Sequence, residues 1–466
     1  MLKSLITLAF ITLMSLSPLL SAKETEDTSH KSLSEDATQE EDLEGVSLED
    51  YLKMILKSNP EILEAKQGIA FYKGFVDEAN GASYPKITFL GIVAPIPAIK
   101  GDVNNSRIDW RKWGPLFMGQ IDVQLPLYTF GRIPNGREAA INAMSAEKEK
   151  VREVKWVVIQ RAKKIYYGYI FAYSAYHNVI VFAEENLSKA IETAEEEYDL
   201  GSGKVTTADV NRLKVGRAEL LRRKATAEKF MDLTKTALAR FIGYKDPDKL
   251  KIAIKEIEAE KVDLKPLEFY AQRGFQNNPQ WNQLQYGIRA RKAFLNFEKS
   301  YNYPVLFLGA RAYAGYAPHF DDQKSYFAND PFNELGGAVF VGLKWELDFS
   351  RRGKIGRAEA EYKKLLEKEK FARGGIYLLI KKAYAEIEEA KKQMKADYDG
   401  YRAALAWMGF SFLAFQSGTG EAKDALEGLA AVAVYHYNYY DSIFNFNMAL
   451  ARLSQVVGEE VTQLKY

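Results

Sequence analysis

Two halves of this sequence repeat the same short motifs in the same order. Pro60 and Pro279 both follow asparagine and lie 219 residues apart, and the same offset separates Pro85 from Pro304, each preceded by tyrosine. The other matched segments are 47–51 with 266–270, 127–132 with 347–353, and 198–203 with 415–420. Five landmarks in one order indicate an internal duplication, so we expect two copies of one structural unit.

The duplication divides the chain into segments. A positive residue, an apolar run and a small residue at Ala22 predict a secretory signal peptide, although an uncleaved membrane anchor is the alternative. An acidic, polar stretch follows, which predicts a flexible tail. The segments are 1–22 signal peptide, 23–46 acidic tail, 47–243 first repeat, 244–265 equatorial connector, 266–458 second repeat and 459–466 short tail.

Each half contains one segment with the strict alternation of a β-strand and a second, less regular strand-like segment. Polar and apolar residues alternate strictly over 120–125, and 341–348 places Val, Leu, Trp and Leu on one face. We expect their partner strands near 86–94 and 305–316. Such strands can cross a membrane when tilted, but a soluble two-layer sheet alternates in the same way.

Very long helices follow the strands. From 136 to 199 there is no proline and only Gly168 interrupts an apolar stripe with steps of three and four. About 60 residues at 1.5 Å each predict a helix of roughly 90 Å. Gly201 and Gly203 then permit a tight reversal, and 354–416 repeats the plan with a weak point at Gly374-Gly375.

The strand count bears on assembly if the strands are in a membrane. Two pairs give four strands, and four strands with one lipid-facing side leave open edges that lipid does not tolerate. Bacterial barrels have eight or more strands. Several chains must then share one barrel, with eight strands from two copies or twelve from three.

Composition and motifs argue against several function classes. The chain has no cysteine, which excludes disulfides, thiolate catalysis and cysteine-ligated zinc. The 64 basic and 62 acidic residues lack the basic excess of a nucleic-acid binder. The four histidines are scattered, no HExxH or GxSxG motif occurs, and Gly203-Lys204 is not a phosphate-binding loop. We expect neither an enzyme nor a cofactor or metal.

The duplicated motifs together resemble the TolC-like outer-membrane efflux protein family. The resemblance rests on the two Asn-Pro and two Tyr-Pro pairs, the strand exits and the two Gly turns, spanning 47–458. It implies a mostly α-helical α+β membrane protein, in which a homotrimer forms a 12-stranded β-barrel continued by a long antiparallel α-helical periplasmic tunnel. It also implies location in the outer membrane of a Gram-negative bacterium, contact with outer-membrane lipid, and docking to a periplasmic adaptor and an inner-membrane transporter.

The function implied is an exit duct of an efflux pump or type I secretion system that conducts substrates passively. The alternative is a non-conducting, periplasm-spanning coiled-coil spacer. The resemblance places a pore constriction or gate at Asp424, Glu427 and Asp209. Asp424 and Glu427 would lie on one helix face near the second turn and form acidic rings in three copies. The alternative is that they are solvated acids in the first turn of a helix, where the helix dipole stabilises negative charge without any gate.

The resemblance also assigns two kinds of contact surface. The adaptor-docking tip would consist of Gly201, Ser202, Gly203, Lys204, Gly418, Thr419 and Gly420, although turn chemistry alone explains these residues. Basic and aromatic residues at the strand ends predict anchoring at a membrane interface, with solvation as the alternative. These anchors are Arg132, Arg351, Arg352 and Trp345.

Overall fold

The computed structural model describes residues 45–101, 107–201, 203, 205–253, 256–320 and 332–466. The expected signal peptide and nearly all of the acidic tail therefore lie outside the described residues. The chain forms two compact units, and each takes segments from both halves of the sequence. The helical unit consists of the residues up to Ala65 with Val151–Pro279 and Gly374–Tyr466, and the sheet unit consists of Lys66–Lys150 and Gln280–Arg373.

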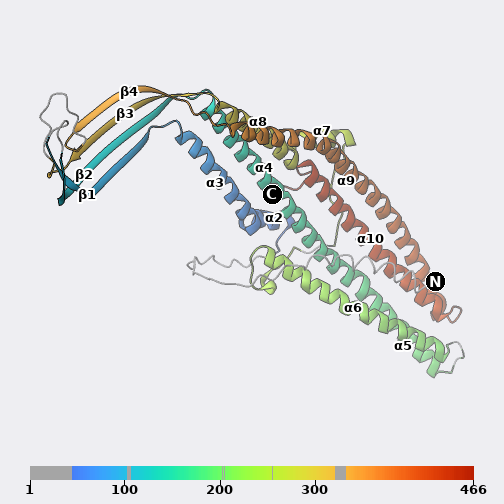
Figure 1. Cartoon of the computed structure of the whole chain (residues 1–466). Coiled ribbons are helices and arrows are strands. Elements are labelled where there is room, and N and C mark those ends of the chain that lie inside the picture. The colour runs from blue at the N-terminus through green and yellow to red at the C-terminus, as the bar shows by residue number, and fades with distance from the viewer. Residues whose placement is uncertain (1–44, 102–106, 202, 204, 254–255, 321–331) are drawn as a thin grey trace. The chain divides into compact units, whose positions relative to one another are not determined.

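One order of elements occurs twice along the chain (Figure 1). The first series is α2 (Leu48–Ser58), α3 (Pro60–Gly81), β1 (Lys86–Lys100), β2 (Arg107–Tyr128), α4 (Arg132–Ala175), a π-helix η2 (Tyr176–Val181), α5 (Phe182–Asp199) and α6 (Thr207–Phe241). After the short 3₁₀ helix η3 (Pro247–Lys249), the second series is α7 (Leu267–Asn277), α8 (Pro279–Ser300), β3 (Val305–Tyr316), β4 (Leu335–Lys344), α9 (Arg351–Gln416) and α10 (Ala422–Val457).

The Asn-Pro motif starts α3. The Asn59 side-chain oxygen accepts the backbone N–H of Glu61 at 2.9 Å, which satisfies a helix-start donor while Pro60 needs none. In the second half, the Asn278 side-chain amide instead donates to the carbonyl of Val456 at 2.6 Å. Both asparagines are 4% exposed, so their polar atoms need these partners.

The four strands form one antiparallel sheet in the order β1-β2-β3-β4. The two halves meet at β2 and β3, where Gln120 faces Tyr313 and Asp122 faces Arg311. The two alternating segments and the two partner strands expected from the sequence all lie in this sheet. However, β4 ends at Lys344 and does not continue to Asp348, because Asp348 turns the chain toward α9 by accepting the backbone N–H of Ser350 at 2.8 Å.

The helix expected over 136–199 is helical throughout but is not one regular α-helix. A six-residue π-helix separates α4 from α5. The weak point expected at Gly374-Gly375 does not end α9, which contains 66 residues. The boundaries between the two units fall within α3, α4, α8 and α9.

The core of the helical unit holds aliphatic and tyrosine side chains from α2, α4, α6 and α10. Among them, the Lys163 ammonium is 2% exposed and lies 2.7 Å from the Glu460 carboxylate, so the buried charge is paired. The residues at both ends of the described chain pack on this unit. Val46 pairs with Ile252 in the connector, and the Tyr466 hydroxyl donates to Glu460.

Candidate functional site

One face of the sheet is apolar, and the residues that the structure describes in the sheet unit leave much of it exposed. Because side chains alternate along a strand and the register is fixed, the residues of this face follow directly. Phe89, Leu335 and Val339 are 73%, 86% and 75% exposed. The apolar face consists of Ile87, Phe89, Val93, Phe117, Ile121, Val123, Leu308, Ala310, Ala312, Ala314, Leu335, Val339, Val341 and Leu343. Water is a poor solvent for such a surface.

The opposite face, called the polar face below, carries the charged and amide side chains of the same strands, together with apolar Leu90, Ile92, Met118, Phe307 and Phe340. Arg311 Nε donates to Asp122 Oδ1 at 2.6 Å, and Gln120 donates to the other carboxylate oxygen. Phe340 lies over Gly309, where a Cβ would come within 2.5 Å of its ring. On this polar face, the charges of Asp122 and Arg311 are therefore paired across β2 and β3.

The exits of the strands into helices share one aromatic cluster in the sheet unit. Phe130 adopts φ 48° and Gly131 adopts φ 89°, which turns the chain sharply from β2 into α4. Phe130 stacks on Tyr303, the tyrosine of the second Tyr-Pro pair, with ring centres 5.8 Å apart. The motif residues of both halves thus pack together at this junction.

The predicted interface anchors fall into two groups. The guanidinium groups of Arg132 and Arg351 lie over the Tyr301 ring, at 3.9 and 4.1 Å from its centre. Arg351 also pairs with Glu298 at 2.8 Å, so both arginines are engaged within the protein. Arg352 is exposed, and Trp345 is 58% exposed.

At the first Gly turn, both described glycines have left-handed backbones. Gly201 has φ 62° and Gly203 has φ 72°, while Ser202 and Lys204 lie outside the described residues. Asp209 forms a capping box with Thr206: its carboxylate accepts the Thr206 backbone N–H at 3.1 Å, and Thr206 caps the Asp209 N–H. This helix-capping contact is enough to explain an acidic residue at position 209. A role of Asp209 in a gate stays a prediction.

The second turn folds back on the end of α9. The backbone N–H groups of Thr419 and Gly420 both donate to the Ala414 carbonyl at 2.9 Å, and Gly418 has φ 73°. Asp424 follows in the first turn of α10 and is exposed, and Glu427 is half-buried one turn later. The structure therefore brings the second-turn residues and the two acids to one end of α10.

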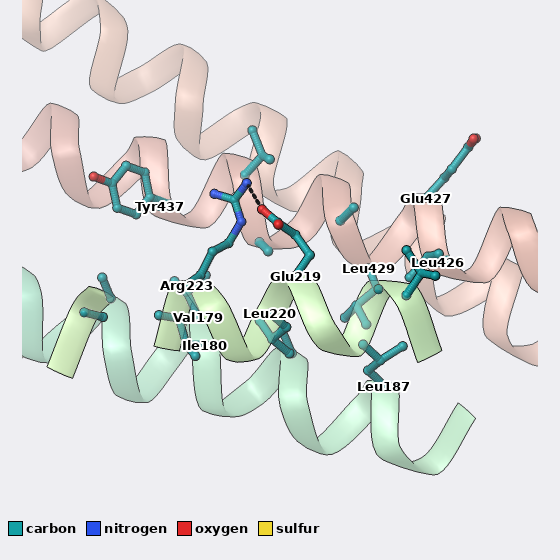
Figure 2. Close-up of a pocket in the computed structure, with 18 of the residues that line it drawn as sticks. Val179, Ile180, Leu187, Glu219, Leu220, Arg223, Leu426, Glu427, Leu429 and Tyr437 are labelled. Carbon is teal, nitrogen blue, oxygen red and sulfur yellow. Dashed lines mark ion pairs between the residues drawn. The ribbon is translucent and has the colours of Figure 1, made fainter. Parts of the chain in front are cut away.

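An apolar groove in the helical unit was not anticipated from the sequence. It has a volume of about 470 Å³ and lies between α4, α5, α6 and α10, with the π-helix forming part of its wall (Figure 2). Its labelled side chains include Ile180, Leu187 and Leu426, and the ion pair of Arg223 with Glu219 crosses its edge at 2.7 Å. Glu427 lies beside the groove with its carboxylate directed away from the leucines. Apolar spacing on each helix was visible in the sequence, but not which faces remain unfilled.

The described residues show neither a metal cluster nor a membrane-crossing helix. They contain no group of three or more His, Cys, Asp or Glu side chains that could hold a metal ion. No helix within the described part of the chain combines the length and the apolar character needed to cross a membrane.

Known structures share this fold. No protein-family model and no curated protein matches the sequence. The outer-membrane channel OprN has a TM-score of 0.73 at 14% identity, over 88% of this chain and 89% of OprN. The outer membrane protein VceC of Vibrio cholerae gives 0.73 at 14% identity, over 89% of this chain and 96% of VceC. The Campylobacter jejuni CmeC outer membrane channel gives 0.68 at 12% identity, over 96% of both chains.

The chain therefore has the fold of outer-membrane channels, a mostly helical structure with a small antiparallel sheet. The resemblance to TolC-like channels that the duplicated motifs predicted is confirmed at the level of the fold. This likeness extends over most of the chain.

Proposed function

We propose that this protein is the outer-membrane exit duct of a tripartite efflux pump or type I secretion system in a Gram-negative bacterium. The observation that carries the proposal is the two-sided sheet. An exposed apolar face with Phe89 and Val339 suits lipid, and the opposite face with paired Asp122 and Arg311 suits a water-filled lumen.

The edges of the sheet support a shared barrel. Strands β1 and β4 lie at the two edges of the described sheet, and backbone groups at a lipid-exposed edge must find partners. Pairing β4 of one copy with β1 of the next satisfies both edges. Three copies give a 12-stranded barrel, which is the assembly that we propose.

The long helices supply the rest of the duct in this proposal. Helices α4 to α6 and α9 with α10 would form a periplasmic tunnel in three copies. The turns at Gly201, Gly203 and 418–420 would dock to a periplasmic adaptor, and an inner-membrane transporter would supply energy. Asp424 and Glu427 would form acidic rings at the narrow end of the tunnel. The duct itself conducts passively.

The deciding test is single-channel conductance of the purified, detergent-extracted oligomer in a planar bilayer. We expect small, cation-preferring steps from a heat-modifiable oligomer found in the outer membrane. Large unselective steps would support a duct but contradict acidic rings at its constriction. A soluble monomer would rule out the duct, and an inserted oligomer without conductance, even with the adaptor present, would favour a spacer.

A further inference from the structure

The π-helix interrupts a long helical run at one defined place. Residues Tyr176–Val181 form it, with regular α-helix on both sides in α4 and α5. π-Helices make up well under 1% of residues in proteins, mostly as single-turn bulges inside α-helices, and these bulges are frequent at functional sites. The wider turn changes the backbone hydrogen-bond pattern, so such a segment persists only where its surroundings hold it.

Helix α10 holds the π-helix through its polar groups. The Asn178 side-chain amide donates to the Tyr440 hydroxyl at 2.8 Å, and the Asn178 backbone carbonyl accepts a hydrogen bond from His436. His436 is 8% exposed and lies between the rings of Tyr401 and Tyr440, with centres 4.1 and 4.5 Å away. The Tyr440 hydroxyl donates in turn to Glu256 of the connector. The contact at this level is therefore polar and directional.

The π-helix also borders an apolar groove of about 470 Å³ between α4, α5, α6 and α10. Its lining includes Ala175 of α4 and Val179 and Ile180 of the π-helix, and it continues toward Leu426 of α10 (Figure 2). Side chains that border an unfilled apolar space lack dispersion partners on one side. Moving α5 and α6 relative to α10 there costs less than moving elements of a close-packed core.

We propose that the π-helix Tyr176–Val181 is the hinge about which the α5–α6 hairpin moves against α10. The contacts of Asn178 with His436 and Tyr440 latch the hinge, and the groove is the space that closes or widens as the hairpin moves. The hairpin ends at the turn with Gly201 and Gly203. This hinge rests on the proposed function, because it sets the position of the tip in a duct.

A disulfide across the groove tests the hinge directly. Gly216 of α6 and Leu426 of α10 are neighbours, since a Cβ at Gly216 would lie 3.0 Å from Leu426 Cδ1. The natural chain has no cysteine, so the double variant Gly216→Cys with Leu426→Cys can form only the intended bridge within a chain. The matched control is Gly274→Cys with Ile380→Cys, which joins α7 to α9 where a Cβ at Gly274 would lie 2.4 Å from Ile380 Cδ1.

The readout is the rate of transitions between conductance levels of single oligomers, before and after a reductant. We expect the oxidised groove lock to reduce these transitions at least tenfold, the reductant to restore them, and the control bridge to leave them unchanged. Unchanged transitions in the oxidised lock would overturn the hinge, as would failure of the bridge to form in intact oligomers. If parent and reduced variants do not conduct at all, the proposed function fails instead.

A second pair of variants tests the latch. His436→Phe keeps a ring between Tyr401 and Tyr440 but cannot donate to the Asn178 carbonyl. His177→Phe makes the same change on the π-helix, where His177 is exposed and its ring packs at a tilt against Tyr173 with centres 4.2 Å apart. We expect several-fold more transitions with His436→Phe and no change with His177→Phe. Equal effects of the two variants would contradict the latch.

Discussion

The guanidinium of Arg351 lies 4.1 Å from the centre of the Tyr301 ring. Arg132, from the first half of the chain, lies over the same ring at 3.9 Å. The two arginines occupy the strand exits that the duplicated motifs share, so one tyrosine joins both halves of the sheet unit. Cation–π contacts of this kind contribute about 0.5–1 kcal/mol at exposed sites and about 2 kcal/mol when desolvated.

Replacing this ring should loosen the junction. Tyr301→Leu removes both cation–π contacts, and we expect a loss of about 1–3 kcal/mol, visible as a lower Tm of the purified oligomer. Tyr301→Phe keeps the ring face and serves as the control, with a Tm close to that of the parent. A Leu variant as stable as the Phe variant would show that the ring is dispensable there.

Two adjacent residues of β4 distinguish the faces of the sheet. Val339 lies on the apolar face and Ala338 on the polar face, and both are exposed in the single chain. Arginine on a lipid face costs about 2–4 kcal/mol at the membrane midplane. We expect Val339→Arg to reduce the yield of inserted oligomer strongly and Ala338→Arg to leave it nearly intact. If Ala338→Arg instead reduced the yield and Val339→Arg did not, the face that carries Ala338 would be the lipid-facing one.

Ion selectivity tests the acids at the start of α10. Asp424→Asn with Glu427→Gln removes two negative charges per chain without changing side-chain size. If these acids line the constriction, the preference for cations should fall several-fold in reversal-potential measurements, because the local field weakens. Asp399→Asn, at an exposed position on α9, is the control. Equal ion selectivity of the parent and the double variant would show that Asp424 and Glu427 do not line the constriction.

Variants of Asp209 and Thr206 distinguish a helix-capping role of Asp209 from a gating role. Its capping box with Thr206 predicts that Asp209→Ala destabilises the start of α6 by about 0.5–2 kcal/mol. Thr206→Ala breaks the same box and should lower the Tm to a similar extent. A gate role predicts in addition that only Asp209→Ala changes single-channel conductance. Identical conductance of the two variants would leave Asp209 as a capping residue.

The stability of the helical unit should depend on the protonation of Asp441. Burial raises the pKa of this carboxyl from 3.8 to about 6, in spite of the hydrogen bond from Asn445 at 2.9 Å. Because the folded-state pKa exceeds the unfolded one, the ionised carboxyl destabilises the fold increasingly as the pH rises from about 4 to 6, and then by a constant amount.

Asp441→Asn removes that charge. We expect its Tm to exceed that of the parent at pH 8 and to match it more closely at pH 4.5, as measured by thermal unfolding of the purified oligomer. Asp399→Asn again provides an exposed control. A gain in Tm that is the same at both pH values would rule out burial of the Asp441 charge as its cause.

Local sequence patterns predicted helices, strands and turns well where a single signal, such as alternation or glycine at a turn, determines the structure. Alternation located parts of β2 and β4, and the less regular segments expected near 86–94 and 305–316 lie in β1 and β3. The Gly turns at Gly201 and Gly418 have the left-handed backbones that glycine favours. Alternation failed at the end of β4, since it continues through Asp348 although Asp348 has local hydrogen bonds that start a helix. The π-helix had no signature in the sequence, because Asn178 is held by Tyr440, 262 residues away.

The sequence by itself determined the duplication, the strand and helix segments, and the resemblance that the fold confirms, because these depend on short-range periodicity and on Pro and Gly at fixed positions. Only the tertiary structure decided which strands pair, that Arg132 and Arg351 share Tyr301, and where the apolar groove remains open. The physical reason is that such contacts join residues far apart in the chain, and their geometry follows from packing that no single segment specifies.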